Sequence, residues 1–256
     1  MAKKSPVNNV DETVETKESI RQYNATNQLK LKIDNLKTFH PLTENQKTFF
    51  DAYRQGEPNI ILHGVAGTGK SFCAVYKGIE EVLNKDNGFQ QVVIVRSAVQ
   101  SREIGHLPGS EKDKLEIFQQ PYKQIATSLF GRPDAYQRLT EQGHVMFVST
   151  SFVRGMTFDN SIIIVDETQN LTLEECHAIA TRIGYRSKII WCGDYRQNDL
   201  YRKKNDVSGI LPFFNILSRM PSFCRIEFGI DDIVRSELCK EYIIAKMEYD
   251  QETDLN

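Results

Sequence analysis

Three glycines, a lysine and a serine lie close together after an apolar run, and their spacing is the strongest chemical signal in the sequence. Gly64, Gly67, Gly69, Lys70 and Ser71 fit the pattern G-x-x-x-x-G-K-[ST] of a phosphate-binding loop, the P-loop. The glycines let the backbone turn tightly and leave N–H groups free to surround phosphate oxygens. The lysine would reach the β- and γ-phosphates, and the serine would hold Mg²⁺. The alternative is a glycine-rich turn that Lys and Ser follow by chance.

The flanks of this loop have the context that the motif requires. Residues 59–64, NIILHG, are a short apolar and β-branched run that predicts a buried strand. Residues 70–83 repeat apolar side chains at spacings of three and four, which predicts a helix whose N-terminus would favour an anion. The candidate nucleotide-binding residues are therefore Gly64, Val65, Ala66, Gly67, Thr68, Gly69, Lys70, Ser71 and Phe72.

An acidic pair follows a second apolar run, SIIIV at residues 161–165. Four apolar residues and then two acids form the Walker B pattern. Asp166 would bind Mg²⁺, directly or through water, and Glu167 would orient or deprotonate an attacking water. The alternative is a strand that ends in two solvated acids.

A third polar group follows the apolar run SKIIWC at residues 187–192. Gly193-Asp194-x-x-Gln197 would lie at the carboxyl end of a strand, where α/β proteins place their ligands. Asp194 and Gln197 could sense the γ-phosphate or its water. Gly-Asp is also good turn chemistry, so a simple turn explains the same residues.

Composition restricts the class of protein without naming a partner. The 256 residues include 32 basic and 34 acidic side chains, so no overall charge demands nucleic acid or a membrane surface. Five separated cysteines without metal-ligand spacing indicate reduced thiols, and no apolar run approaches the roughly 18 residues that span a bilayer. We expect a cytoplasmic protein, of a bacterial cell or of a phage-infected host.

Strands and helices alternate along most of the chain, which predicts an α/β fold with a parallel sheet covered by helices on both faces. Residues 1–38 are expected to form a mobile arm with a short exposed strand at 28–33, residues 39–248 one domain, and residues 249–256 an acidic tail. Pro121 should kink or split a helix over residues 110–131. Gly184 should end a helix that begins with a capping box of Thr172 and Glu175. The expected strands are 59–64, 91–95, 144–149, 161–165, 187–192 and 223–228, with a further helix starting near Ser208.

Taken in order, several segments resemble the PhoH-like family of P-loop ATPases. They are GVAGTGKS, VRSAVQSREIGHLPG, RGMTFDNSIIIVDETQN, RIGYRSKIIWCGDYRQNDL, SGIL and DDIVRS, and the resemblance runs from about Thr43 to about Glu248. It implies a single RecA-like core, akin to the first motor domain of superfamily-1 helicases. Ser97 and Thr168 depart from the family's usual proline and alanine, but both are small and leave the acidic pair intact.

The resemblance also implies roles for two further residues. In helicase-like ATPases a glutamine upstream of the P-loop reads adenine, and Gln46 stands in that place, although Thr43 and Gln46 also fit a capping box. Arg235 matches a late arginine of the family that can stabilise charge on the transferring phosphoryl group. In a one-core protein it could act on a neighbouring subunit. A surface ion pair with Asp231 or Asp232 is the alternative.

A basic and aromatic segment suggests a polynucleotide partner. Residues 195–204 place Tyr195, Arg196, Tyr201, Arg202, Lys203 and Lys204 together, a combination that suits single-stranded nucleic acid. A solvated loop or a subunit contact explains them equally, and residues 96–109 are a second candidate for strand contact.

These features lead to one functional expectation and two rivals. We expect an ATPase that uses ATP and Mg²⁺, is coupled to RNA or single-stranded DNA, and acts as a homo-oligomer, with a hexamer as the specific guess. The rivals are an ATP-driven switch that acts on proteins and a small-molecule kinase. Glu167 beside Asp166 argues against the kinase, which must keep water from the γ-phosphate.

Overall fold

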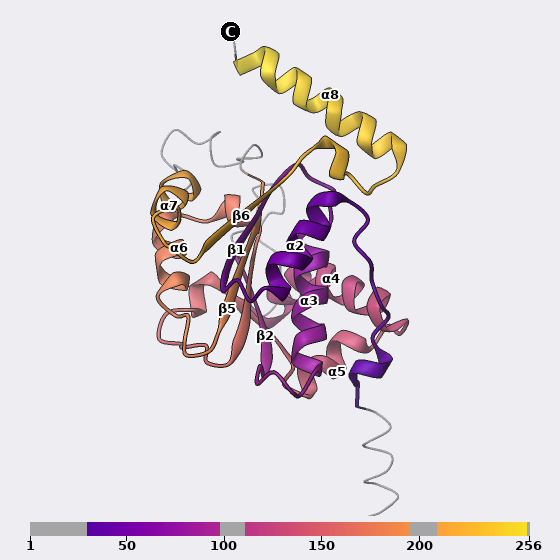
Figure 1. Cartoon of the computed structure of the whole chain (residues 1–256), viewed down its shortest axis with the longest axis vertical. Coiled ribbons are helices and arrows are strands. Elements are labelled where there is room, and N and C mark those ends of the chain that lie inside the picture. Colours follow the sequence, from indigo (N-terminus) through magenta and orange to yellow (C-terminus); the bar gives the residue numbers. More distant parts are fainter. Residues whose placement is uncertain (1–29, 98–110, 195–208, 255–256) are drawn as a thin grey trace, which may run out of the picture.

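The computed structural model describes residues 30–97, 111–194 and 209–254, and these residues form one six-stranded sheet (Figure 1). All strand pairs are parallel, and the strand order is β3-β2-β4-β5-β1-β6. This confirms the predicted α/β class. The strands are β1 (Asn59–Gly64), β2 (Gln91–Arg96), β3 (Val145–Ser149), β4 (Ser161–Asp166), β5 (Lys188–Gly193) and β6 (Phe223–Phe228).

The central strands are continuous apolar runs because both of their faces are covered. Every residue of β1 and β4 is buried, and in β5 only the first residue is not. Parallel sheets need such coverage, since each crossover helix lies on one face or the other. The hydrophobic core therefore consists of two layers, one on each side of the sheet.

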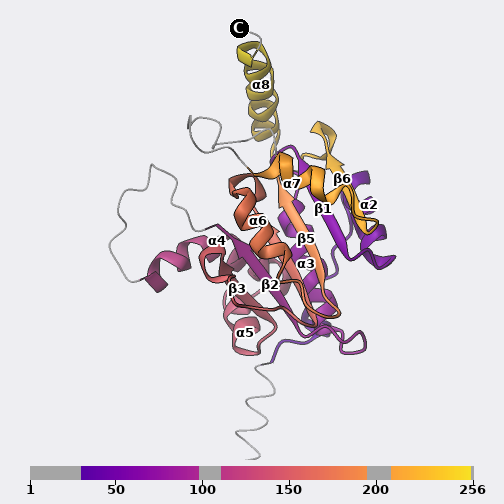
Figure 2. The same ribbon diagram turned by 90° about the vertical axis from the view of Figure 1, so that its left-hand side faces the viewer.

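The helices divide between these two faces, as Figures 1 and 2 show. The first layer packs α2, α3, α4 and α5 against the sheet, and the second packs α6 and α7 against the other face. The helices are α2 (Glu44–Arg54), α3 (Lys70–Leu83), α4 (Glu111–Phe130), α5 (Ala135–Glu141), α6 (Leu173–Ala180), α7 (Ile210–Leu217) and α8 (Glu237–Asp254). Four 3-10 helices are η1 (Ile33–Asn35), η2 (Thr150–Phe152), η3 (Thr168–Asn170) and η4 (Ile230–Asp232).

The N-terminal segment differs from its prediction. Residues 30–32 of the expected strand are irregular, and η1 follows in place of its last residue. Leu31 is 4% exposed in the core, and the amide of Lys37 donates to the carbonyl of Leu129 at 2.9 Å. A strand here would have no partner for its backbone groups, whereas burying Leu31 removes apolar surface from water. The described part of the expected arm, residues 30–38, thus lies against the domain.

Two helix predictions need correction at their ends. Helix α4 runs through Pro121 as one element. Pro121 is exposed, so the carbonyl that loses its amide donor lies on a face that water can reach. Helix α6 begins at the predicted capping box but ends at Ala180 rather than near Gly184. A Cβ at Gly184 would lie 2.1 Å from Oδ1 of Asp159, so this glycine permits a close approach of two loops instead of ending the helix.

Two helices were not predicted, and one of them changes the expected C-terminus. Helix α5 is short, and α8 includes residues 249–254 of the expected acidic tail. In α8, Lys246 pairs with Asp250 one turn later at 2.5 Å, a spacing that supports helices. Figure 1 shows α8 extending away from the body of the molecule. No helix in the described ranges is long and apolar enough to cross a bilayer.

Gly209 is required by the contact between α6 and α7, because a Cβ there would lie 1.8 Å from the backbone nitrogen of Leu173. We predict that Gly209→Ala lowers the free energy of unfolding by about 3 kcal/mol, since neither backbone can move aside cheaply. For a chain of this size that is a loss of roughly 6–12 °C in Tm, measurable by thermal unfolding. Gly229→Ala is the matched control, because open space surrounds its Cβ position. Equal Tm values for the two variants would contradict the steric argument.

Candidate functional site

The loop between β1 and α3 has the backbone that its glycines predict. Gly64, Gly67 and Gly69 have φ values of 119°, 77° and 80°, a region that side chains disfavour. Gly64 has a second reason to be glycine, since a Cβ would lie 2.1 Å from the carbonyl oxygen of Phe228. Helix α3 begins at Lys70, directly after this turn, so the free amides of its first turn face the loop. The strand–loop–helix prediction is confirmed.

Lys70 lies within the loop rather than in solvent. It is 9% exposed, and Nζ donates to the carbonyls of Gly64 at 2.9 Å and Val65 at 2.7 Å and to Oγ1 of Thr68 at 3.2 Å. Burial lowers the pKa of Lys70, and the nearby carboxylate of Asp194 opposes this shift. The ammonium is thus held where the loop closes on itself, with its position fixed by the same backbone that would surround a phosphate.

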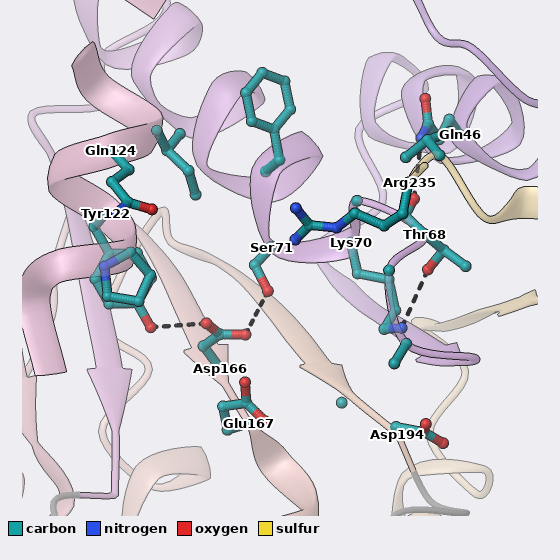
Figure 3. Close-up of a pocket in the computed structure, with 18 of the residues that line it drawn as sticks. Gln46, Thr68, Lys70, Ser71, Tyr122, Gln124, Asp166, Glu167, Asp194 and Arg235 are labelled. Carbon is teal, nitrogen blue, oxygen red and sulfur yellow. Dashed lines mark hydrogen bonds between the residues drawn. The ribbon is translucent and has the colours of Figure 1, made fainter. Parts of the chain in front are cut away.

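Asp166 and Ser71 meet although 95 positions separate them in the sequence. Oγ of Ser71 donates to Oδ1 of Asp166 at 2.6 Å, and the hydroxyl of Tyr122 donates to Oδ2 at 2.7 Å (Figure 3). A carboxylate and a hydroxyl are hard oxygen ligands of the kind Mg²⁺ takes. The described residues contain no group of three or more His, Cys, Asp or Glu that could hold a metal alone. The site therefore fits a cation that draws its other ligands from phosphates and water.

Glu167 is held beside this pair in an uncommon conformation. Its φ of 53° is in the left-handed region, a conformation found mostly at constrained sites in residues other than glycine. Nε2 of Gln169 donates to Oε2 of Glu167 at 2.6 Å, and the backbone amide of Asp194 donates to Oε1 of Gln169 at 3.1 Å. Burial, and then the charge of Asp166, raise the pKa of Glu167. These bonds join the carboxyl ends of β4 and β5.

Gln46 is almost fully buried at the edge of the P-loop. Its Nε2 donates to the carbonyl of Thr68 at 3.0 Å, and its Oε1 accepts from the backbone amide of Leu42 at 2.8 Å. Oγ1 of Thr43 caps the helix by accepting from the Gln46 amide at 3.3 Å. Only half of the capping box is formed, because the Gln46 side chain turns to Leu42 and the P-loop instead of to Thr43.

Arg235 lies over the P-loop of its own chain. The amide of Val234 donates to the carbonyl of Gly67 at 3.1 Å, and a Cβ on Gly67 would lie 2.9 Å from Cγ of Arg235. Figure 3 shows the guanidinium extending into the cavity beside Ser71. Among the described residues Arg235 forms no ion pair with Asp231 or Asp232. Asp232 instead accepts from Asn45 and from the amide of Gly229.

These residues surround one cavity of about 630 Å³. The predicted residues that line it are Gln46, Ala66, Gly67, Thr68, Gly69, Lys70, Ser71, Phe72, Asp166, Glu167, Asp194 and Arg235. Gly64 and Val65 lie below the cavity as acceptors for Lys70. Gln197, the basic segment 195–204 and residues 98–109 lie outside the described residues.

Sequence reasoning missed two side chains of this cavity, Arg96 and Tyr122. Arg96 ends β2, where it pairs in register with Asp166, and its position at the end of an apolar run was the available signal. Tyr122 fitted the apolar repeat of its helix and was interpreted as core. Its ring is indeed buried, but its hydroxyl reaches the acidic pair.

Comparison with known proteins gives matches along most of the chain. The family model described as "PhoH-like protein" matches residues 38–247. The PhoH-like protein of Mycobacterium leprae is 31% identical over 218 residues, 84% of this chain and 60% of the relative. That of Bacillus subtilis is 31% identical over 212 residues, 82% of this chain and 64% of the relative. Protein PhoH of Escherichia coli K12 is 30% identical over 188 residues, 73% and 52% of the two chains.

A solved structure with a related outline is the large terminase of a thermophilic bacteriophage, at a TM-score of 0.45 and 11% identity over 79% of this chain and 50% of that one. The curated relatives are longer, so the chain spans between about half and two thirds of their length. Because the family model covers nearly all of the described fold, with relatives about 30% identical over most of its length, the chain belongs to the PhoH-like family of P-loop nucleotide-binding proteins.

Proposed function

We propose that the chain is a Mg²⁺-dependent ATPase whose RecA-like unit, residues 39–248, couples hydrolysis to RNA or single-stranded DNA. The observation that carries the hydrolytic part is the convergence of Lys70, Ser71, Asp166 and Glu167 on one cavity, with 2.6 Å between Oγ of Ser71 and Oδ1 of Asp166. Two sequence motifs far apart in the chain supply these side chains. A loop that only turned the chain would not need them to meet.

The triphosphate would lie along the P-loop amides. Nζ of Lys70 would exchange some of its carbonyl partners for β- and γ-phosphate oxygens, which stabilise its charge better than neutral acceptors do. Ser71 and Asp166 would hold Mg²⁺, which supplies charge neutralisation at the phosphates. The Gln46 amide, which both donates and accepts, would bind adenine next to Phe72.

Glu167 would act as the general base. The oxygen of a water attacks the γ-phosphorus, the bond from that phosphorus to the bridging oxygen breaks, and the water's proton goes to Glu167. Burial raises the pKa of Glu167, which makes its carboxylate a better proton acceptor. Gln169 would keep the carboxylate turned toward the water, while Asp194 and Gln197 would sense the γ-phosphate.

Support for the polynucleotide is indirect, because it rests on the basic and aromatic residues of segment 195–204 and on the resemblance of the family to helicase cores. A homo-oligomer, with a hexamer as the specific case, would supply the second core that translocation needs. The protein-directed switch is the rival to be separated by experiment. The kinase is disfavoured by Glu167, which would admit water to the reaction.

Turnover of ATP, measured as phosphate release with and without RNA or single-stranded DNA, tests this proposal directly. We predict Mg²⁺-dependent release that polynucleotide accelerates, and a loss of roughly 10²–10³-fold in Lys70→Ala, because the cation facing the phosphates is removed. Lys47→Ala is the control, since Lys47 is exposed and paired with Glu44. Full activity in folded Lys70→Ala protein would reject the P-loop mechanism. Turnover indifferent to polynucleotide would favour the switch.

Glu167→Gln should bind ATP as the parent does and hydrolyse it roughly 10²–10⁴-fold more slowly, because the amide keeps the shape but cannot accept the proton. Single-turnover hydrolysis and binding of a fluorescent nucleotide separate the two effects. The matched control is Glu174→Gln, an exposed acid in the first turn of α6. Unchanged hydrolysis in Glu167→Gln would leave the acidic pair with a metal-binding role only.

Arg235→Ala should retain ATP binding and lose roughly 10³-fold in turnover, the low end of the effect of such arginines. Because Arg235 lines the cavity of its own chain, an equimolar mixture with Lys70→Ala should regain no activity. Mass measurement of tagged chains must show that subunits exchange. Recovery in the mixture would mean that the arginine completes a neighbour's site. Arg54→Ala, an exposed arginine paired with Asp51, controls for lost charge.

A further inference from the structure

The carboxylate of Asp166 is held at both oxygens by hydroxyl groups from two different helices. Ser71 at the start of α3 donates to Oδ1, and Tyr122 in the middle of α4 donates to Oδ2 (Figure 3). Asp166 is itself 5% exposed, so water cannot readily replace either donor. The Ser71 contact belongs to the metal-binding pair. The Tyr122 contact has no part in the P-loop or Walker B motifs.

Tyr122 presents its hydroxyl from a fixed position. Its side chain is 1% exposed, and its ring lies 6.0 Å from that of Phe147 on β3. Burial, and then the charge of Asp166, raise the pKa of Tyr122, so the hydroxyl stays protonated and remains a donor. A neutral donor orients a carboxylate without cancelling its charge, whereas a lysine or arginine in this place would compete with a cation.

We propose that Tyr122 is a positioning residue for the metal, one that keeps Oδ2 of Asp166 occupied so that Oδ1 stays turned toward Ser71. The inference rests on the proposed Mg²⁺-nucleotide function and adds a member to the site that neither motif contains. Hydrogen bonds to the ligands of a metal fix their orientation, and their loss typically weakens metal binding about 10–100-fold. In Tyr122→Phe the ring would still fill its place in the core, and Oδ2 would lose its donor.

The position of Tyr122 also connects the metal pair to β2. Arg96, the last residue of β2, lies near the Tyr122 hydroxyl, and its charge opposes the increases in the pKa values of Tyr122 and Glu167. Its guanidinium lies 5.8 Å from the ring of Phe118, one turn before Tyr122 on α4. The ends of β2 and β4 and the middle of α4 therefore meet around one carboxylate.

The test measures metal binding itself and uses Mn²⁺ as the probe. Free Mn²⁺ is followed by electron paramagnetic resonance while it is titrated into protein with saturating ADP, and Mg²⁺-dependent ADP binding is measured by calorimetry. Tyr122→Phe should need about 10-fold more of either metal, and its ADP affinity in excess chelator should equal that of the parent. Tyr136→Phe is the matched control, because its buried hydroxyl has no hydrogen-bond partner among the described residues.

The outcomes separate this inference from the proposed function. If the parent binds ADP equally with and without metal, the Mg²⁺ part of the proposed function fails. If the parent depends on metal and Tyr122→Phe matches it, the positioning role is wrong. An equal shift in Tyr136→Phe would mean that any lost buried hydroxyl has this effect, which also overturns the inference. Unfolding of Tyr122→Phe at the assay temperature would make the hydroxyl a requirement of the fold and reject the proposal as well.

Discussion

The site depends on one contact, the hydrogen bond between Ser71 and Asp166, which joins the ends of two strands that are not neighbours. In the strand order β4-β5-β1, β5 lies between them, so the chain must cross the carboxyl end of β5 closely. Gly193 at that end makes this crossing fit. A Cβ there would lie 2.1 Å from Oγ1 of Thr168 and 2.8 Å from Oε1 of Gln169. The small residue in β5 and the acidic pair after β4 are thus parts of one steric arrangement.

Burial sets the electrostatics of the same region. It lowers the pKa of Lys70 and raises that of Glu167, and each of these charges opposes the other's shift. A lone buried charge is costly, so the two signs are compatible only because they share one cavity. The carbonyls of Gly64 and Val65 stabilise the ammonium from within the loop. The charged groups are therefore already fixed relative to each other by the folded protein.

The sequence was sufficient for the sheet and for most of the cavity, for a physical reason. Fully buried parallel strands are apolar throughout, and their carboxyl ends carry the polar residues, so strands and site appear together as local patterns. Features built from distant parts were missed. Tyr122 matches the helical repeat as well as any core residue, and only the folded chain brings its hydroxyl to Asp166. Helix α8 was missed because exposed Leu238, Tyr242 and Tyr249 blur its apolar periodicity. The role of Gln197 stays a prediction, since it lies outside the described residues.

The segment that carries Arg235 is attached to the P-loop by its own backbone, which bears on how the protein could work. Asp232 accepts from Asn45 of α2, the amide of Val234 donates to Gly67, and the arginine follows directly. The guanidinium is therefore positioned by the loop whose phosphates it would stabilise, and no second chain is needed to bring it there. On this arrangement one chain holds every described group that the proposed hydrolysis requires. Assembly and polynucleotide binding would then govern when the reaction occurs and what its energy moves, rather than whether the site is complete.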